Sequence, residues 1–237
     1  MTELDQHTRT TTTGDLSRWA RGVVPAPHEE VRDRGPRFIA GAMVASPLAM
    51  TAWFLVEPAV LPREDAEVFL GSVAASPDRY LAATAMVALA GALGVAAAIG
   101  VVRLLRERLP RLAPFLGVVL VLSGLGLFAQ VGFRLVTLSL VPDGSVPESA
   151  VASHAAFQSS GYFDLLLLPG LALGALGTVL LLGALLRTGV VSRWVPFALL
   201  AGAVLASGEL PDPVTVGGAA LGAFANLQLA RALLSRG

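Results

Sequence analysis

The chain has 237 residues, of which 54% are hydrophobic and 14% are charged, and its formal net charge is zero. Soluble globular chains carry about 25% charged residues, and the apolar residues here fall in runs of about twenty, the length that crosses a bilayer. The composition therefore excludes an ordinary soluble domain and predicts an all-α, polytopic membrane protein. Because the chain has no cysteine, disulfides, thiolate metal sites and thiol redox chemistry are excluded as well.

The first 36 residues predict a cytoplasmic tail that is mostly disordered, since they are polar, proline-containing and rich in threonine. One segment of this tail could instead form a helix. Leu16, Trp19 and Val23 share one helical face, which is typical of a short helix lying on the inner membrane surface.

Residues 37–234 predict a six-helix transmembrane bundle, because six apolar segments follow one another along this part of the chain. The segments cover residues 37–56, 80–102, 112–141, 162–186, 194–208 and 214–234.

Arginine distribution predicts the orientation of these spans. The tail with Arg37, the connectors 103–111 and 187–193, and the C-terminal end from Arg231 onward hold 14 of the 17 arginines. The other three connectors hold only Arg63 and Arg79. Cytoplasmic loops carry the excess of basic residues, so both termini are expected in the cytoplasm.

Two of the outer connectors contain short helical patterns. Ala66, Phe69, Leu70 and Val73 have helical spacing, and a second helix-compatible run begins at Glu148. These helices would either cap the mouth of the bundle or shield the ends of the spans.

Small residues recur every four positions on most spans, for example at Ala90, Gly94 and Ala98. Such faces let helix backbones approach closely in lipid. They predict a compact bundle, and a homo-oligomer is the alternative use of the same faces.

Arg134 is the most unusual polar residue, because it lies within the third apolar segment, where a charge is costly. Gln130 lies one turn deeper, and Asp164 opens the next span at a comparable outer depth. Since the two spans are joined by one connector, they are expected to be antiparallel neighbours. We therefore predict an Arg134–Asp164 ion pair, with Gln130 extending a polar track inward.

Two further polar residues complete the candidate site. Asn226 continues the small-residue face of the sixth span, and Glu209 follows the short fifth span near the outer interface. Together the five residues would line an outward-facing cavity for an anion or a proton-coupled solute. The alternative is structural: arginine can extend its charge to the headgroups, and Asn226 can bond across a helix contact.

The three histidines, His7, His28 and His154, all lie outside the apolar segments. Intramembrane haem, di-iron and histidine-based protease sites therefore have no candidates. With no catalytic motif and no net charge, we expect no enzyme activity, no metal or other cofactor, and no nucleic-acid partner.

Three local patterns resemble small, uncharacterised multi-pass membrane proteins of high-GC bacteria. They are Ala40-Gly41-Ala42 with Ser46-Pro47-Leu48, Tyr80-Leu81 after Ser76-Pro77-Asp78-Arg79, and the arginine-rich stretch from Arg103 to Arg108. The resemblance covers residues 37–190 and implies a multi-pass protein of the bacterial plasma membrane, without implying an activity.

Two functions are consistent with these observations. The first is a non-catalytic accessory or sensory bundle, whose tail and arginine-rich loops meet a cytoplasmic protein or anionic lipid. The second is a small permease or ligand-binding bundle that uses Arg134, Gln130 and Asp164. Water access to the polar face distinguishes the two.

Overall fold

A computed structural model describes residues 27–57, 65–205 and 212–235, and this part of the chain is all-α, without a strand. Its helices in chain order are α2 (Pro27–Val56), α3 (Ala66–Ala75), α4 (Pro77–Leu105), α5 (Leu112–Ser139), α6 (Glu148–Ser159), α7 (Tyr162–Thr188), α8 (Trp194–Leu205) and α9 (Asp212–Leu234), with a short 3-10 helix, η1 (Pro142–Gly144), before α6. The all-α prediction is confirmed.

The chain divides into two units, residues 1–38 and 39–237. In the first unit the described residues form the opening turns of α2, which begins at Pro27. The predicted surface helix at Leu16, Trp19 and Val23 lies outside the described residues. The second unit contains α2 from Ile39 onward and all the later helices.

Four of the described helices are long and apolar enough to cross a membrane. They are Gly35–Val56 within α2, the whole of α4, the whole of α5, and Leu168–Thr188 within α7. Two of the six predicted spans are not among them. Helix α8 has only 12 residues, and α9 has 23 but carries Asn226, Gln228 and Arg231 among its apolar residues.

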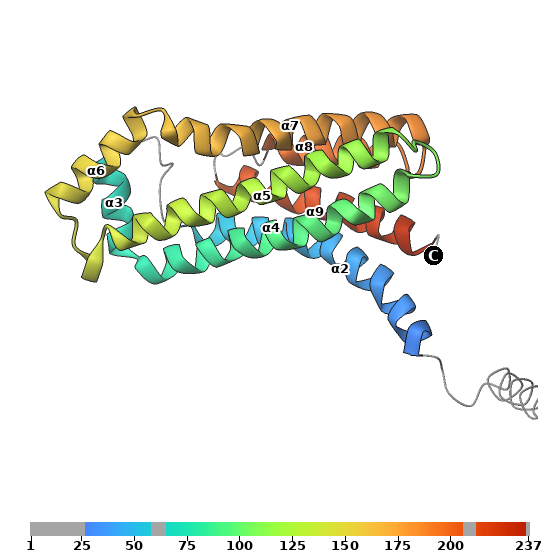
Figure 1. Cartoon of the computed structure of the whole chain (residues 1–237), viewed down its shortest axis with the longest axis horizontal. Helices are drawn as coiled ribbons and strands as arrows, with labels where there is room; N and C mark the ends of the chain where they lie inside the picture. Colours follow the sequence, from blue (N-terminus) through green and yellow to red (C-terminus); the bar gives the residue numbers. More distant parts are fainter. Residues whose placement is uncertain (1–26, 58–64, 206–211, 236–237) are drawn as a thin grey trace, which may run out of the picture. The chain divides into compact units, whose positions relative to one another are not determined.

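Helices α4, α5 and α7 lie side by side, with α5 in contact with both neighbours (Figure 1). Glycines set the distance of closest approach. A Cβ atom added at Gly126 of α5 would lie 2.8 Å from the Gly170 Cα of α7, and one at Gly91 of α4 would lie 3.2 Å from the Gly124 carbonyl oxygen. Backbone therefore packs on backbone, which is how helices gain van der Waals contact in lipid.

Helices α8 and α9 form a second close pair. A Cβ atom at Gly202 would lie 2.8 Å from the Gly222 nitrogen and 2.9 Å from the Gly218 carbonyl oxygen. The small-residue faces predicted from the sequence thus form contacts within this bundle.

The two predicted short helices are present as α3 and α6, which lie together at one end of the long helices (Figure 1). We call this the capped end. Its apolar cluster contains Phe69, Leu70, Val73, Ala74, Tyr80, Val141 and Ala150. The Asp65 carboxylate accepts a hydrogen bond of 2.8 Å from the Glu67 backbone N–H and so caps the start of α3. The predicted apolar face of α3 is buried and holds the cap on the bundle.

Candidate functional site

Arg134 lies on α5 near the capped end and forms an ion pair with Glu57, the residue that follows α2. Its Nη2 atom is 2.6 Å from Glu57 Oε2. The two side chains are 11% and 15% exposed, respectively. A charge pair this far removed from solvent is stable only when further hydrogen bonds satisfy its remaining atoms.

Thr84 and Trp53 provide hydrogen bonds to the pair, and Tyr80 provides an aromatic contact. Arg134 Nε donates to Thr84 Oγ1 at 2.9 Å, and the Thr84 hydroxyl in turn donates to the Tyr80 carbonyl at 2.7 Å. The guanidinium carbon lies 4.1 Å from the centre of the Tyr80 ring, within cation–π distance. Trp53 Nε1 donates to Glu57 Oε2 at 2.5 Å.

We call these five residues, Arg134, Glu57, Trp53, Thr84 and Tyr80, the arginine node. The node joins α5 to α4 and to the end of α2, so it connects three segments that are far apart in the sequence. Its geometry gives the cation a carboxylate, a hydroxyl and an aromatic face from the protein itself.

The ion pair that Arg134 forms is with Glu57 and not with the predicted partner Asp164. Asp164 is exposed in the first turn of α7. The direction of the Arg134 side chain around the α5 axis explains this difference. Gly126 faces α7, but Arg134 follows it by eight residues, which turns its side chain about 80° around a helix of 3.6 residues per turn.

The other predicted site residues do not join the node. Gln130 is half-buried on α5 and takes no part in the hydrogen bonds of the node. Asn226 is half-buried on α9 and donates from Nδ2 to the Gly222 carbonyl of its own helix at 2.9 Å. Glu209 lies outside the described residues.

A histidine that the sequence analysis left aside is buried in the cap. His154 of α6 is 2% exposed, and its ring stacks on Phe69 at 5.0 Å between centroids and lies 5.8 Å from Phe133. Its Nε2 atom is buried without a hydrogen-bond partner among the described residues. Burial lowers the pKa of His154 below its ordinary value of 6.5, because the charged imidazolium is poorly solvated there.

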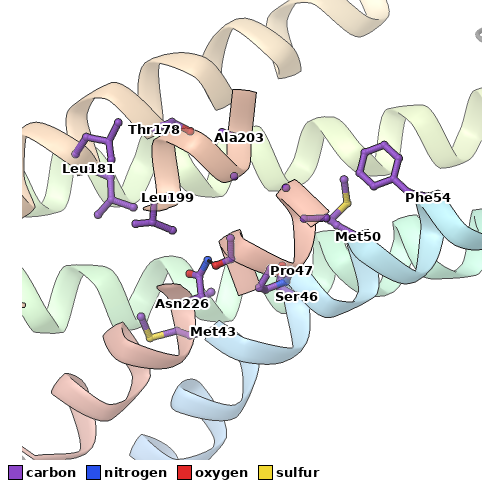
Figure 2. Close-up of a pocket in the computed structure, with 16 residues that line it drawn as sticks. Met43, Ser46, Pro47, Met50, Phe54, Thr178, Leu181, Leu199, Ala203 and Asn226 are labelled. Carbon is purple, nitrogen blue, oxygen red and sulfur yellow. Dashed lines mark hydrogen bonds between the residues drawn. The ribbon is translucent and has the colours of Figure 1, made fainter. Parts of the chain in front are cut away.

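A pocket of about 440 Å³ is lined by residues other than those of the node (Figure 2). Its lining comes from α2, α7, α8 and α9, with one residue from α4. Asn226 is the only predicted site residue in that lining. The five predicted residues thus separate into an ion pair at the capped end, a pocket residue on α9, and residues that join neither.

The contacts of Arg134 with Glu57, Thr84, Tyr80 and Trp53 were not predicted from the sequence. The positions of these residues relative to the predicted spans could have indicated the contacts. Glu57 directly follows the first predicted span, and Tyr80 and Thr84 begin the second, so all three lie toward the predicted outer side, as Arg134 does. Matching polar residues by depth across all spans, rather than across one connector, would have found the ion pair.

No group of three or more histidine, aspartate or glutamate side chains gathers among the described residues. The chemistry available in the node is charge neutralisation and hydrogen bonding.

An all-α chain with four helices able to cross a bilayer fits the class of helical membrane proteins. The chain belongs to the family described as Domain of unknown function (DUF4386), whose match covers residues 39–209. This region includes the arginine node, the cap and most of the pocket lining, whereas α9 follows it. Neither the curated proteins nor the solved structures contain a match to the chain.

Proposed function

We propose that this chain is a non-catalytic accessory or sensory protein of a bacterial plasma membrane, with six crossing helices and both termini in the cytoplasm. The four long apolar helices support the first four crossings. The close α8–α9 pair supports a final hairpin, and the arginine distribution supports the orientation.

The observation that carries the proposal is the internal pairing of Arg134. Glu57 neutralises the cation, Thr84 binds its Nε, and Tyr80 covers its face. An arginine engaged in this way stabilises the contact between helices. The pairing therefore argues against a permease in which Arg134 binds the transported anion.

The arginines at the end opposite the cap support an interaction role. Arg103, Arg106 and Arg111 are exposed around the α4–α5 turn, and Arg108 donates to the Thr188 carbonyl at the end of α7. Basic residues beside a span gain about 1 kcal/mol each from anionic lipid. This cytoplasmic surface would meet acidic headgroups or an acidic face of a protein partner.

The test exploits the natural absence of cysteine. A Gln130→Cys variant is treated in intact cells with a membrane-impermeant thiol reagent, and Leu125→Cys, an exposed position of the same helix, serves as the lipid-facing control. We expect neither residue to be labelled, because the polar track is closed inside the bundle. Labelling of Gln130→Cys at the rate of the exposed Ser145→Cys would show a water-filled path and overturn the proposal.

Two surface cysteines test the topology in the same assay. Ser145 lies at the capped end and Ser192 in the connector between α7 and α8, and both are exposed. We expect Ser145→Cys to react in intact cells and Ser192→Cys only after permeabilisation. The reverse pattern would place the cap in the cytoplasm.

A further inference from the structure

The pocket lies at the depth of the membrane core. Its α2 residues, from Met43 to Phe54, fall within the span Gly35–Val56, and its α7 residues, from Thr178 to Leu182, fall within the span Leu168–Thr188. This pocket of about 440 Å³ is partly open, and its lining makes fewer van der Waals contacts when nothing fills it. Its volume is in the range of small-molecule binding sites.

Small residues on α8 and α9 border this space. The two glycines Gly202 and Gly222 differ in whether helix packing requires them to be small. Gly202 must be small, because its Cβ would collide with the backbone of α9. Gly222 lines the pocket, yet a Cβ atom there would meet nothing within 4 Å. Close helix packing therefore does not require glycine at position 222, and its missing side chain leaves room for something else.

The lining selects an apolar molecule. Thirteen of the sixteen lining residues are apolar, and none is charged. Met43, Met50 and Phe54 extend along α2, and methionine side chains adapt readily to a flexible hydrocarbon. A ligand with a formal charge would remain unpaired here, which is costly at this depth.

The three polar residues of the lining present hydrogen-bond acceptors. The Ser46 hydroxyl donates to the Ala90 carbonyl at 3.0 Å, and the Thr178 hydroxyl donates to the Gly174 carbonyl at 2.9 Å. Asn226 donates to the Gly222 carbonyl, and its Oδ1 atom accepts no hydrogen bond from the described residues. Both hydroxyl protons are committed to backbone, whereas Asn226 keeps its Oδ1 acceptor and its second Nδ2 hydrogen. The matching ligand group is therefore a hydroxyl, which donates to Oδ1 and can also accept.

We propose that the pocket binds a long-chain alcohol from the bilayer, with its chain against Met43, Met50 and Phe54 and its hydroxyl donating to Asn226. Figure 2 shows these side chains gathered from α2 and α9, with Thr178 and Leu181 contributed by α7. The inference goes beyond the accessory role proposed above and does not depend on the arginine node.

Photo-crosslinking in reconstituted vesicles tests this site. The full-length protein in phosphatidylcholine vesicles is exposed to a fatty alcohol that carries a diazirine in its chain, or to the methyl ether of the same molecule. Crosslinks are then mapped to peptides by mass spectrometry. We expect the alcohol to label peptides containing Met43, Met50 and Leu181 about fivefold more than the ether does, the factor that one hydrogen bond supplies.

Two substitutions on α9 provide a matched pair. Gly222→Leu fills the pocket, whereas Gly217→Leu adds the same side chain at an exposed position of α9 that does not line it. Both glycines have open space at Cβ. We expect Gly222→Leu to abolish the labelling of the pocket peptides and Gly217→Leu to leave it unchanged.

A third variant tests the acceptor. In Asn226→Leu the alcohol is expected to label no better than the ether. Equal labelling by alcohol and ether in the unmodified protein would overturn the proposal without any variant, because the pocket would then hold hydrocarbon irrespective of a donor. Undiminished labelling in Gly222→Leu would overturn it as well. Neither result depends on whether Gln130→Cys reacts with water-soluble reagents, so the two proposals fail separately.

Discussion

The arginine node and the pocket both contain a polar residue that interrupts an apolar helix, yet the two residues are used differently. Arg134 contacts a carboxylate, a hydroxyl and an aromatic ring, which come from segments far apart in the sequence. Asn226 bonds only to the carbonyl four residues earlier in its own helix and lines a cavity. Arg134 joins segments of the chain, whereas Asn226 can still form further hydrogen bonds.

This difference shows that a polar residue at membrane depth does not by itself identify a ligand site. What distinguishes the two cases is whether other segments of the chain bind the side chain, as Glu57 and Thr84 bind Arg134. Substitutions in the node should therefore affect stability, whereas those in the pocket should affect binding and leave stability nearly unchanged.

Removing the carboxylate of the node should have the largest effect. Glu57→Ala leaves the Arg134 charge buried without its counter-ion, and we expect the free energy of unfolding to fall by about 3–5 kcal/mol. The measurement is steric trapping or SDS titration in bicelles. Adding Arg134→Met to Glu57→Ala should recover most of the loss. Losses that simply add in the double variant would show that the ion pair contributes nothing.

Widening the α5–α7 contact should have the next largest effect. Gly126→Ala places a Cβ atom 2.8 Å from the Gly170 Cα, and because the obstacle is backbone, the helices must separate. We expect a loss of about 1–3 kcal/mol in the same unfolding assay. Gly222→Ala in the pocket is the control, since its Cβ meets nothing. Equal losses for both would contradict the packing described here.

The hydroxyl of the node should contribute less. Thr84→Val removes the acceptor of Arg134 Nε, for which we expect a loss of about 0.5–1.5 kcal/mol. Thr178→Val in the pocket is the matched substitution, because the Thr178 hydroxyl donates to a carbonyl of its own helix. It should change the unfolding free energy by less than Thr84→Val does. Thr84→Ser should restore the loss if the hydroxyl is responsible.

Acid should loosen the cap rather than the whole bundle. Because burial lowers the pKa of His154, the unfolded cap binds a proton more readily than the folded one. The stability of the cap is therefore highest above the ordinary histidine pKa of 6.5, and it falls as the pH drops from there toward the lowered value.

Hydrogen exchange of α6 amides at about pH 7.5 and pH 5.5 measures this effect, on either side of the ordinary histidine pKa. His154→Gln is the reference, since intrinsic exchange changes equally in both proteins. We expect extra opening at the lower pH only with histidine present. The same pH response in His154→Gln would assign the effect to another group.

The smallest change in stability is expected for Asn226→Leu, at most about 0.5 kcal/mol. Its amide bonds only within α9, so no second helix loses a partner. A loss comparable to that of Glu57→Ala would mean that Asn226 joins helices after all, and the contrast between node and pocket would disappear.

Local sequence patterns predicted the helices well. Periodic apolar residues marked α3, and the predicted start of the third span, residue 112, coincides with the start of α5. Arg134 was identified because a charge within an apolar run stands out without any knowledge of its neighbours. These features depend on residues a few positions apart.

The residues that contact Arg134 and His154 could not be predicted in the same way. The sequence suggested Asp164 because one connector joins its helix to that of Arg134, whereas the structure brings in Glu57 from the end of α2. His154 was passed over, since a histidine in a polar connector gives no sign that aromatic rings from α3 and α5 will bury it. Which side chain meets another depends on the rotation of each helix about its axis.

The sequence by itself determined that this chain is all-α and built of apolar helices, with short helices in two of the connectors. Backbone groups in hydrocarbon must bond within their own helix, so length and hydropathy are sufficient for that inference. Only the tertiary structure decided that Arg134 is neutralised by Glu57 and that Gly222 and Asn226 border a cavity. Both outcomes depend on helix rotation and closest approach, which are properties of packed helices rather than of a single one.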